Sequence, residues 1–316
     1  MTESARFIQM LADGLGNGSI YALLAVGFVV IYKSTQVISF AQPALMVAGA
    51  VAVSYLGVAL GLGGVEPPAL GIPIAFTLAV LGGMAFASFL ALGVERAALR
   101  PLVGRPVFIA AIVTLGVDVV VRNIANRFIG ANPKQMNDPF GFDSFVVGGA
   151  SVPQRDIAVF LIALAVFGAL FAFFKFSRLG LAMRAAAFDQ EVALAQGINV
   201  GTVFAVSWVL AAALAALAGA FLFGESGVDQ LGWVKAFKAL PAIILGGLDS
   251  IGGALIGGLS VGMIEAVFST YQGDGAGQFL AFLGSNFAGV SPYVLMLLVL
   301  MFRPYGLFGT PEIERV

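Results

Sequence analysis

The sequence contains no cysteine and no histidine among its 316 residues. This excludes thiol chemistry, disulfide bonds, a histidine-based catalytic triad and a histidine proton relay. The usual zinc ligands are also missing, so we predict no metal site. An intramembrane enzyme would have to rely on a serine or aspartate dyad, and no motif for one is present. We therefore predict no catalytic residue.

Charge is scarce as well. Charged residues make up 10% of the chain, whereas a soluble domain carries about 25%. The deficit extends along the whole chain, which is 60% hydrophobic with a mean hydropathy of +1.01. No soluble domain can be separated, so we predict an all-α polytopic membrane protein with a single permease domain over residues 1–316. The net charge of −1 indicates neither a nucleic acid partner nor a patch for anionic lipid.

Apolar windows long enough to cross hydrocarbon, about 18–20 residues, recur along the chain. Each has a centre nearly free of charge, as the cost of inserting charged residues requires. The abundant glycine and alanine favour helices that pack closely in lipid. The predicted spans are 15–32, 36–60, 69–93, 107–121 (or 107–125), 157–174, 202–223 and 290–302.

Residues 236–268 are too long for one simple helix, and Pro241, a glycine pair and Asp249 interrupt them. A short half-helix followed by a full span fits better, because broken backbone at membrane depth must be buried by protein. The total is then about eight to nine transmembrane helices plus a re-entrant half-helix and a short cytoplasmic coupling helix. Two pairs of small residues predict a packing face: Gly253 with Gly257, and Gly258 with Gly262.

The longest polar connection is 122–156, and its Pro, Asn, Asp and Gly content predicts turns. We assign it to the extracytoplasmic side if odd-numbered spans run inward. That topology places nine of the sixteen basic residues inside. The bias is too small to determine the orientation by itself.

A compact charged segment at about 177–200 interrupts the apolar stretches. On a helix of about 3.6 residues per turn its apolar side chains form one stripe: Leu181, Ala185, Phe188, Val192 and Ala195. Gly197 suits the position after the helix, and Ile198 can make the apolar contact of a Schellman ending. The sequence predicts a short amphipathic helix of about four turns.

Two interpretations of this helix compete. A helix lying among lipid headgroups favours a basic polar face. Here Arg184 stands beside Asp189 and Glu191, so the face is mixed in sign. A helix whose stripe docks in a protein groove, with mixed charges that set the register, fits better.

The pattern of Arg184, Ala185, Ala187, Asp189, Ala193 and Gly197-Ile198 resembles the cytoplasmic coupling loop of ABC-importer permeases. More narrowly, the chain resembles the LivH-type permease of branched-chain amino acid importers over nearly its full length. Residues 14–32 resemble the first span of that family, 238–266 its glycine-rich segment, and 295–316 its terminal span and tail.

The resemblance implies partners and a division of labour. A second related permease would complete a homodimer or heterodimer, two cytoplasmic ATPases would drive it, and an extracytoplasmic binding protein would deliver the solute. Such permeases lie in the bacterial inner membrane. The sequence has no G-x-x-x-x-G-K-[ST] phosphate loop, so we expect no cofactor on this chain, with ATP and Mg²⁺ on the partner ATPases. The residues implied in coupling are Arg184, Ala185, Phe188, Asp189, Val192, Gly197 and Ile198.

Uncharged polar residues enter the first two spans, where unpaired polar groups are costly. They line the translocation pathway or form hydrogen bonds between helices, and the sequence leaves both open. Family members usually carry N-F-A-H-G where this chain has Ser39-Phe40-Ala41-Gln42-Pro43, which leaves the solute undefined. The predicted pathway residues are Asn17, Ser19, Tyr21, Ser39, Phe40 and Gln42.

Three acidic residues lie in or near apolar segments, and such acids suggest a proton or cation relay. Asp118 has Arg122 one turn later, which predicts a local ion pair. Lys238 is a possible partner for Asp249, and Glu265 lies near the end of its span. We favour structural roles for all three, because no chain of Asp, Glu and His is present to carry protons.

The leading functional hypothesis is the permease subunit of an ABC importer for branched-chain or other small neutral amino acids, or related amides and urea. The alternative is an ATP-independent secondary carrier or channel for a small polar solute. A carrier would show paired intramembrane ions and inverted repeats with matching broken helices. The sequence has one broken segment, at 241–253, and no clear counterpart in its first half.

Overall fold

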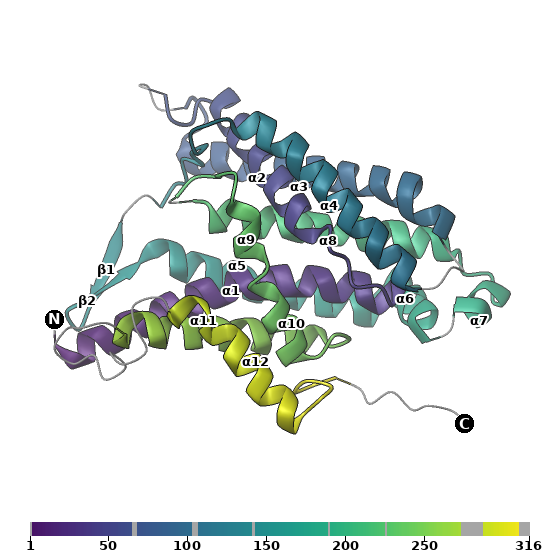
Figure 1. Cartoon of the computed structure of the whole chain (residues 1–316). Helices are drawn as coiled ribbons and strands as arrows, with labels where there is room; N and C mark the ends of the chain where they lie inside the picture. Colours follow the sequence, from purple (N-terminus) through teal and green to yellow (C-terminus); the bar gives the residue numbers. More distant parts are fainter. Residues whose placement is uncertain are drawn as a thin grey trace. The chain divides into compact units, whose positions relative to one another are not determined.

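The computed structural model describes residues 2–64, 68–102, 107–140, 143–188, 190–224, 226–272 and 287–309. Within these ranges seven helices are long and apolar enough to cross a membrane. They account for most of the chain drawn in Figure 1 and confirm the predicted helical membrane fold class. The seven are α1 (Glu3–Thr35), α2 (Gln42–Ala59), α3 (Ile72–Val94), α4 (Val107–Ile129), α5 (Gln154–Phe176), α8 (Val200–Leu222) and α11 (Ile251–Tyr271).

A further apolar helix, α12 (Ser291–Phe302), is shorter. Its 12 residues rise about 18 Å, less than the roughly 30 Å of a hydrocarbon core. The described ranges therefore support seven spanning helices, and the finer count of eight to nine stays a prediction.

The first two helices differ from the predicted windows. α1 begins at Glu3, well before the predicted start at residue 15, because a helix can continue beyond the hydrocarbon where polar side chains are solvated. α2 begins at Gln42 rather than residue 36, after Gln36 adopts a φ of +57°. Pro43 lies in the first turn of α2, where the missing N–H costs nothing.

The predicted polar connection 122–156 is wrong in its bounds, because α4 continues to Ile129 and α5 begins at Gln154. Long polar side chains such as Arg127 can reach water from the end of a spanning helix. Between these helices lies an antiparallel hairpin of β1 (Ser144–Val147) and β2 (Ala150–Pro153). Gly148 and Gly149 have φ of +60° and +82°, which suits a tight hairpin turn.

The chain divides into two compact units. Unit 1 comprises Met1–Ala25, Phe142–Phe167 and Lys238–Val316, and unit 2 comprises Val26–Gly141 and Gly168–Phe237. Both units include parts of α1 and α5, so two helices run through the boundary. That the chain forms one permease domain stays a prediction.

Glycines hold the helices of unit 1 together. A Cβ at Gly258 would collide with Ala22 of α1, and one at Gly262 would collide with the Gly18 backbone. On another side of α11, Gly253 and Gly257 touch the backbone of α10 (Ala239–Gly246). The two predicted pairs of small residues are therefore confirmed as packing positions, with α1 on one side and α10 on the other.

The predicted break between a short helix and a span is also confirmed. Gly247, with φ of +102°, ends α10, and the Ser250 hydroxyl accepts a hydrogen bond from Gly253 N (3.0 Å) to cap α11. Whether α10 is re-entrant stays a prediction.

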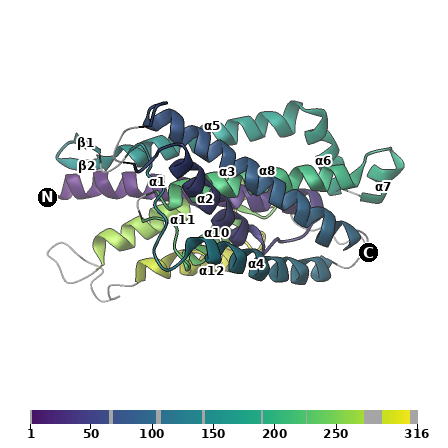
Figure 2. The ribbon, with the colours of Figure 1, turned by 90° about the horizontal axis from the view of Figure 1, so that it is seen from above.

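In unit 2, α8 packs against both α2 and α3 (Figure 2). Trp208 of α8 is buried with Leu99, Ala91 and Leu45 in an apolar cluster. Small residues again allow the helices to approach closely, since a Cβ at Gly49 of α2 would collide with Ala216 of α8.

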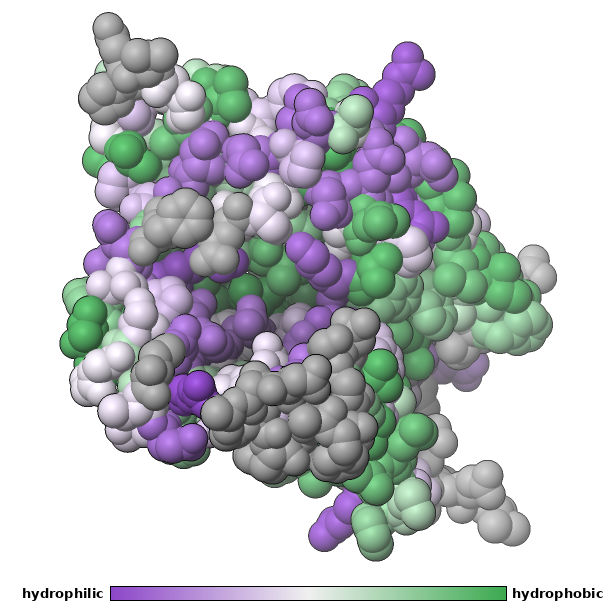
Figure 3. Space-filling view, turned by 60° about the vertical axis from the view of Figure 1, so that its left-hand side comes forward, coloured by the Kyte–Doolittle hydropathy of each residue, from purple (hydrophilic) through white to green (hydrophobic). Residues whose placement is uncertain are grey.

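Large apolar side chains also lie exposed on the outer helices. In Figure 3 hydrophobic side chains cover broad parts of the surface beside the hydrophilic ones. On α3 and α4 they include Phe86, Phe89, Phe108 and Ile112, which are 49–77% exposed. Exposed apolar surface of this extent favours contact with lipid or a partner chain.

Candidate functional site

The predicted coupling segment, about 177–200, follows α5 and contains two short helices, α6 (Arg178–Phe188) and α7 (Gln190–Ala195). Asp189, one of the predicted coupling residues, lies outside the described residues. The Ser177 hydroxyl accepts a hydrogen bond from Gly180 N (2.8 Å) and caps α6. Gly180 lies against the backbone of Phe173 and Phe174, so a side chain there would block the sharp turn from α5.

The segment ends as the sequence predicts. Gly197 has φ of +79°, and its N–H donates to Leu194 O (3.0 Å). Ile198 N donates to Ala193 O, also at 3.0 Å. This pair of bonds defines the Schellman motif, so the position and type of the helix ending are confirmed.

The segment has two apolar faces. One is buried in the chain and consists of Gly180, Met183, Ala186 and Ala193. The other is the predicted stripe, where Leu181 is 60%, Phe188 87% and Val192 55% exposed, while Ala185 is half-buried. We call Leu181, Phe188 and Val192 the coupling stripe. Arg184 is exposed as well, so the part of the chain that the structure describes leaves this surface accessible.

Three predicted pathway residues lie in unit 1. The Tyr21 hydroxyl is buried and donates to Glu265 Oε2 of α11 (2.8 Å). Ser19 is buried and donates to Leu15 O of its own helix (2.6 Å), whereas Asn17 is exposed. Of this trio, Tyr21 forms a side-chain hydrogen bond to another helix.

Glu265 also forms an ion pair with Lys238, which lies just before α10. Both side chains are largely buried, at 26% exposure for Lys238 and 18% for Glu265. The sequence suggests Asp249 as a possible partner of Lys238, and the ion pair that the structure gives Lys238 is with Glu265. That Glu265 lies near the membrane interface stays a prediction. The pair forms because α10 folds back onto α11 along the glycines, which no local pattern reveals.

The other three pathway residues lie in unit 2. Gln42 is fully buried, and its Nε2 donates to Ala211 O of α8 (2.9 Å). Gly27 leaves room for this amide, since a Cβ there would collide with Nε2. Phe40 is half-buried, and its N–H donates to the Thr114 hydroxyl of α4 (3.1 Å). Hydrogen bonds to neighbouring helices therefore position both residues.

Two buried polar atoms of this region lack a partner within the described ranges. They are Oε1 of Gln42 and Oγ of Ser39, whose residue is only 1% exposed. A buried polar atom without a hydrogen bond costs free energy, so such atoms are candidates for contact with a solute or another chain.

The predicted ion pair on α4 is confirmed. Arg122 Nη2 lies 3.2 Å from Asp118 Oδ2, and Asp118 is buried. The guanidinium stacks on the ring of Trp233 at 4.0 Å, in α9 (Gly232–Ala236). Asp118 thus has a local structural partner.

These features define a class of protein, a multi-pass helical membrane protein with polar side chains on spanning helices and an exposed amphipathic segment between two of them. Comparison with known families refines this class. Residues 10–302 match the family model described as branched-chain amino acid transport system / permease component. The chain belongs to this family, as its resemblance to LivH-type permeases predicts.

Individual relatives match the chain over nearly its full length. The chain is 32% identical over 317 residues to the high-affinity branched-chain amino acid transport system permease protein LivH of Escherichia coli K12, covering 98% of both chains. It is 32% identical over 322 residues to the corresponding permease protein BraD of Pseudomonas aeruginosa, covering 100% of both. A solved structure, PsaBC from Streptococcus pneumoniae in complex with Fab, aligns with a TM-score of 0.48 and 13% identity over 92% of this chain and 91% of that one.

Proposed function

We propose that the chain is the transmembrane permease subunit of an ABC importer in a bacterial-type inner membrane. Its solutes would be branched-chain or other small neutral amino acids, with related amides and urea as further candidates. Family membership over residues 10–302 and the names of the full-length relatives support this proposal. The chain would pair with itself or a related permease and receive its solute from an extracytoplasmic binding protein. ATP and Mg²⁺ would bind to two partner ATPases.

The observation that carries the proposal is the coupling stripe. Its large apolar side chains are exposed, while the opposite face of the same segment is anchored in unit 2. Both α6 and α7 contact α8, which packs in turn on α2 and α3. A partner ATPase seated on the stripe could therefore transmit its movement to the buried helices through rigid, close-packed contacts.

The pathway would use the polar residues of the first two spans. Gln42 Oε1 and Ser39 Oγ are the strongest candidates, because they are buried polar atoms without a partner in the described ranges. Uncharged groups of this kind suit the polar atoms of a small amphiphilic solute. Asn17, Ser19, Tyr21 and Phe40 are weaker candidates, since backbone or side-chain contacts occupy three of them and Asn17 is exposed.

The coupling proposal is tested by charge reversal in the segment. We expect Arg184→Glu and Asp189→Lys to weaken association with the ATPases, because mixed charges beside an apolar stripe set the register of the partner. The measurement is the amount of ATPase that co-purifies with the tagged permease, at equal permease yield in the membrane. Arg127→Glu, an exposed site on α4, is the matched control. ATPase recovery unchanged in both variants would count against the docking role.

One observation favours the alternative of an ATP-independent carrier. The Lys238–Glu265 pair places two opposite charges next to a spanning helix, and carriers use such pairs. Uptake by vesicles that contain the purified complex decides between the two. Transport that requires ATP on the side of the vesicle membrane where the ATPases bind supports the importer. Transport driven by an ion gradient without ATP supports the carrier.

A further inference from the structure

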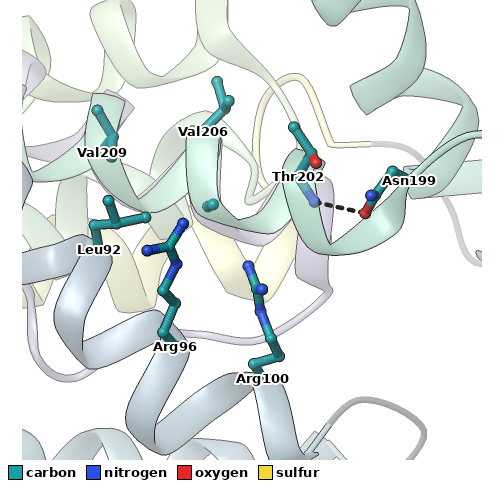
Figure 4. Close-up of a pocket in the computed structure, with 8 residues that line it drawn as sticks. Leu92, Arg96, Arg100, Asn199, Thr202, Val206 and Val209 are labelled. Atoms are coloured by element: carbon teal, nitrogen blue, oxygen red, sulfur yellow. Dashed lines mark hydrogen bonds between the residues drawn. The ribbon is translucent and has the colours of Figure 1, made fainter.

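A cavity of about 300 Å³ lies in unit 2 where α3 ends and α8 begins (Figure 4). Its polar end contains Arg96 and Arg100, with Asn199 and Thr202 on the facing segment. In Figure 4 both arginine side chains extend from the end of α3 toward the first turns of α8. The cavity is separate from the coupling stripe and from the proposed pathway residues.

The backbone at the end of α3 places the two arginines on one side. α3 continues into a short π-helix, η1 (Glu95–Leu99), and then into η2 (Arg100–Leu102). Arg100 N donates to Glu95 O, five residues back, so the turn is widened. Such turns occur often at functional sites. Arg96 and Arg100 follow one another at a spacing of four residues and share a face.

The charges in this cavity do not balance. Glu95 is buried, and its two oxygens accept hydrogen bonds from Nε and Nη2 of Arg100, each at 3.2 Å. Arg100 also reaches Gly201 O of α8 at 3.5 Å, so its guanidinium is held in place. Arg96 has no ion pair or hydrogen bond with any residue that the structure describes. Among the described residues, two guanidiniums against one carboxylate leave the cavity with one excess positive charge.

The two arginines, rather than the backbone N–H groups at the start of α8, are the groups that could bind an anion in this cavity. Asn199 Oδ1 accepts a hydrogen bond from Thr202 N (3.1 Å), so a side chain already caps the first turn. The Thr202 hydroxyl and the Arg96 guanidinium remain exposed at the cavity. An anion that entered would meet a guanidinium with free N–H groups beside a second, fixed guanidinium. Guanidinium forks bind phosphate oxygens in pairs.

The other end of the cavity is apolar. Leu92 of α3 and Val206 and Val209 of α8 line it. α3 and α8 both have the length and composition of spanning helices, so the arginines lie near the end of a membrane-crossing segment. A cavity with basic groups at the polar end and an apolar wall along the helices fits a molecule with an anionic head and a hydrocarbon chain. Basic pockets between spanning helices bind lipid headgroups in this way.

We propose that this cavity binds the headgroup of an anionic phospholipid, with the phosphate at Arg96 and Arg100 and an acyl chain along Leu92, Val206 and Val209. The lipid would connect the end of α3 to the start of α8, the helix that follows directly after the coupling segment. The net charge of −1 hides this site, because the acidic residues elsewhere offset a local excess of one positive charge.

The test compares lipids on the full-length permease, purified in neutral detergent with the subunits that accompany it. The probes are phosphatidylglycerol, phosphatidylcholine of the same chain length, and inorganic phosphate. Native mass spectrometry measures bound lipid, and the midpoint of thermal unfolding measures stabilisation. We expect phosphatidylglycerol to bind more tightly than phosphatidylcholine. Arg96→Gln should weaken it about fivefold, the value of one basic group near a membrane surface.

Arg127→Gln is the matched control, because it removes an exposed arginine from the end of a different spanning helix. It should leave phosphatidylglycerol binding unchanged. Since the Arg96 side chain is exposed and forms no ion pair or hydrogen bond with a described residue, its loss should also leave the yield unchanged. Arg96→Lys keeps the charge and should recover part of the binding.

Three outcomes would overturn the proposal. Equal binding of the two lipids, or unchanged binding by Arg96→Gln, would remove the role of the headgroup charge. Full stabilisation by inorganic phosphate alone would show that the site takes a free anion rather than a lipid. Loss of an accompanying subunit from Arg96→Gln, with lipid binding intact, would assign the cavity to a protein contact instead.

Discussion

Two helices of unit 2 show how little hydropathy says about position in a membrane protein. α4 and α8 each have 23 residues, and their apolar windows have similar mean hydropathies of 1.9 and 2.2. Yet 72% of the α8 window is buried and only 22% of the α4 window. Hydropathy reports whether a helix tolerates lipid, and both helices do.

Side-chain size distinguishes the two helices. The buried residues of α8 include Ala211, Ala212, Ala215, Ala216 and Gly219, which let α2 and α3 approach. α4 carries Ile112, Val119 and Phe128 outward. Its inward side combines apolar contacts, made by Ala110, Val113 and Val117, with the ion pair of the buried Asp118 with Arg122. The two similar helices therefore differ in their contacts: α8 packs closely through small residues, whereas α4 adds a buried charged group to its apolar contacts.

We expect the largest loss of stability from a substitution in the ion pair of α4. Arg122→Met removes the partner of Asp118 and leaves a buried carboxylate unpaired, which costs about 3 kcal/mol. The measurement is the midpoint of thermal unfolding of the purified permease in detergent. The double variant Arg122→Met with Asp118→Asn removes the charge and should recover most of the loss. If it is as unstable as Arg122→Met alone, the pair does not hold α4.

We expect the second-largest loss of stability from a substitution that disturbs the close packing of α8. In Gly219→Leu the new side chain would meet Met46 Cγ and Met46 O at 2.9 Å and Ala50 Cβ at 3.2 Å. Because the backbone of α2 cannot yield, we expect a loss of about 2 kcal/mol and a lower yield of folded protein. Gly116→Leu on α4 is the matched control, since no atom outside its own helix lies within 4 Å of a Cβ there. Equal losses in both variants would contradict the comparison.

We expect the smallest loss of stability from removing the hydrogen bond between Gln42 and α8. Gln42→Met should lower the stability by about 1 kcal/mol, because it removes the bond to Ala211 O but also a buried oxygen without a partner. Thermal unfolding again measures the change, with the exposed Gln196→Met as control. Uptake of leucine by the vesicle-reconstituted complex separates the roles. Full uptake by Gln42→Met would mean that Gln42 only joins helices.

Local patterns identified much of the fold and part of the site. All seven spanning helices coincide with predicted apolar windows or with the predicted span after the break at Gly247. The Schellman ending at Gly197 and Ile198 depends on neighbouring residues, so the sequence predicts it directly. The pair of Asp118 with Arg122 is equally local, one helical turn apart.

Contacts between distant segments could not be predicted in the same way. Lys238 and Glu265 meet only because glycine contacts bring α10 against α11, and Tyr21 joins them from α1. The basic cavity at Arg96 likewise depends on the approach of α3 to α8. The hairpin β1–β2 is a different case, since Gly148-Gly149 between apolar residues is a turn signal that the interpretation of 122–156 overlooked.

The sequence by itself determined that the chain is a helical membrane protein, where most helices cross, and where the coupling segment stops. These properties follow from hydropathy and from bonds between residues a few positions apart. Only the tertiary structure decided which polar groups find partners and which helices are central. In a membrane, lipid and protein interior are equally apolar, so composition cannot tell a helix that faces lipid from one that faces its neighbours.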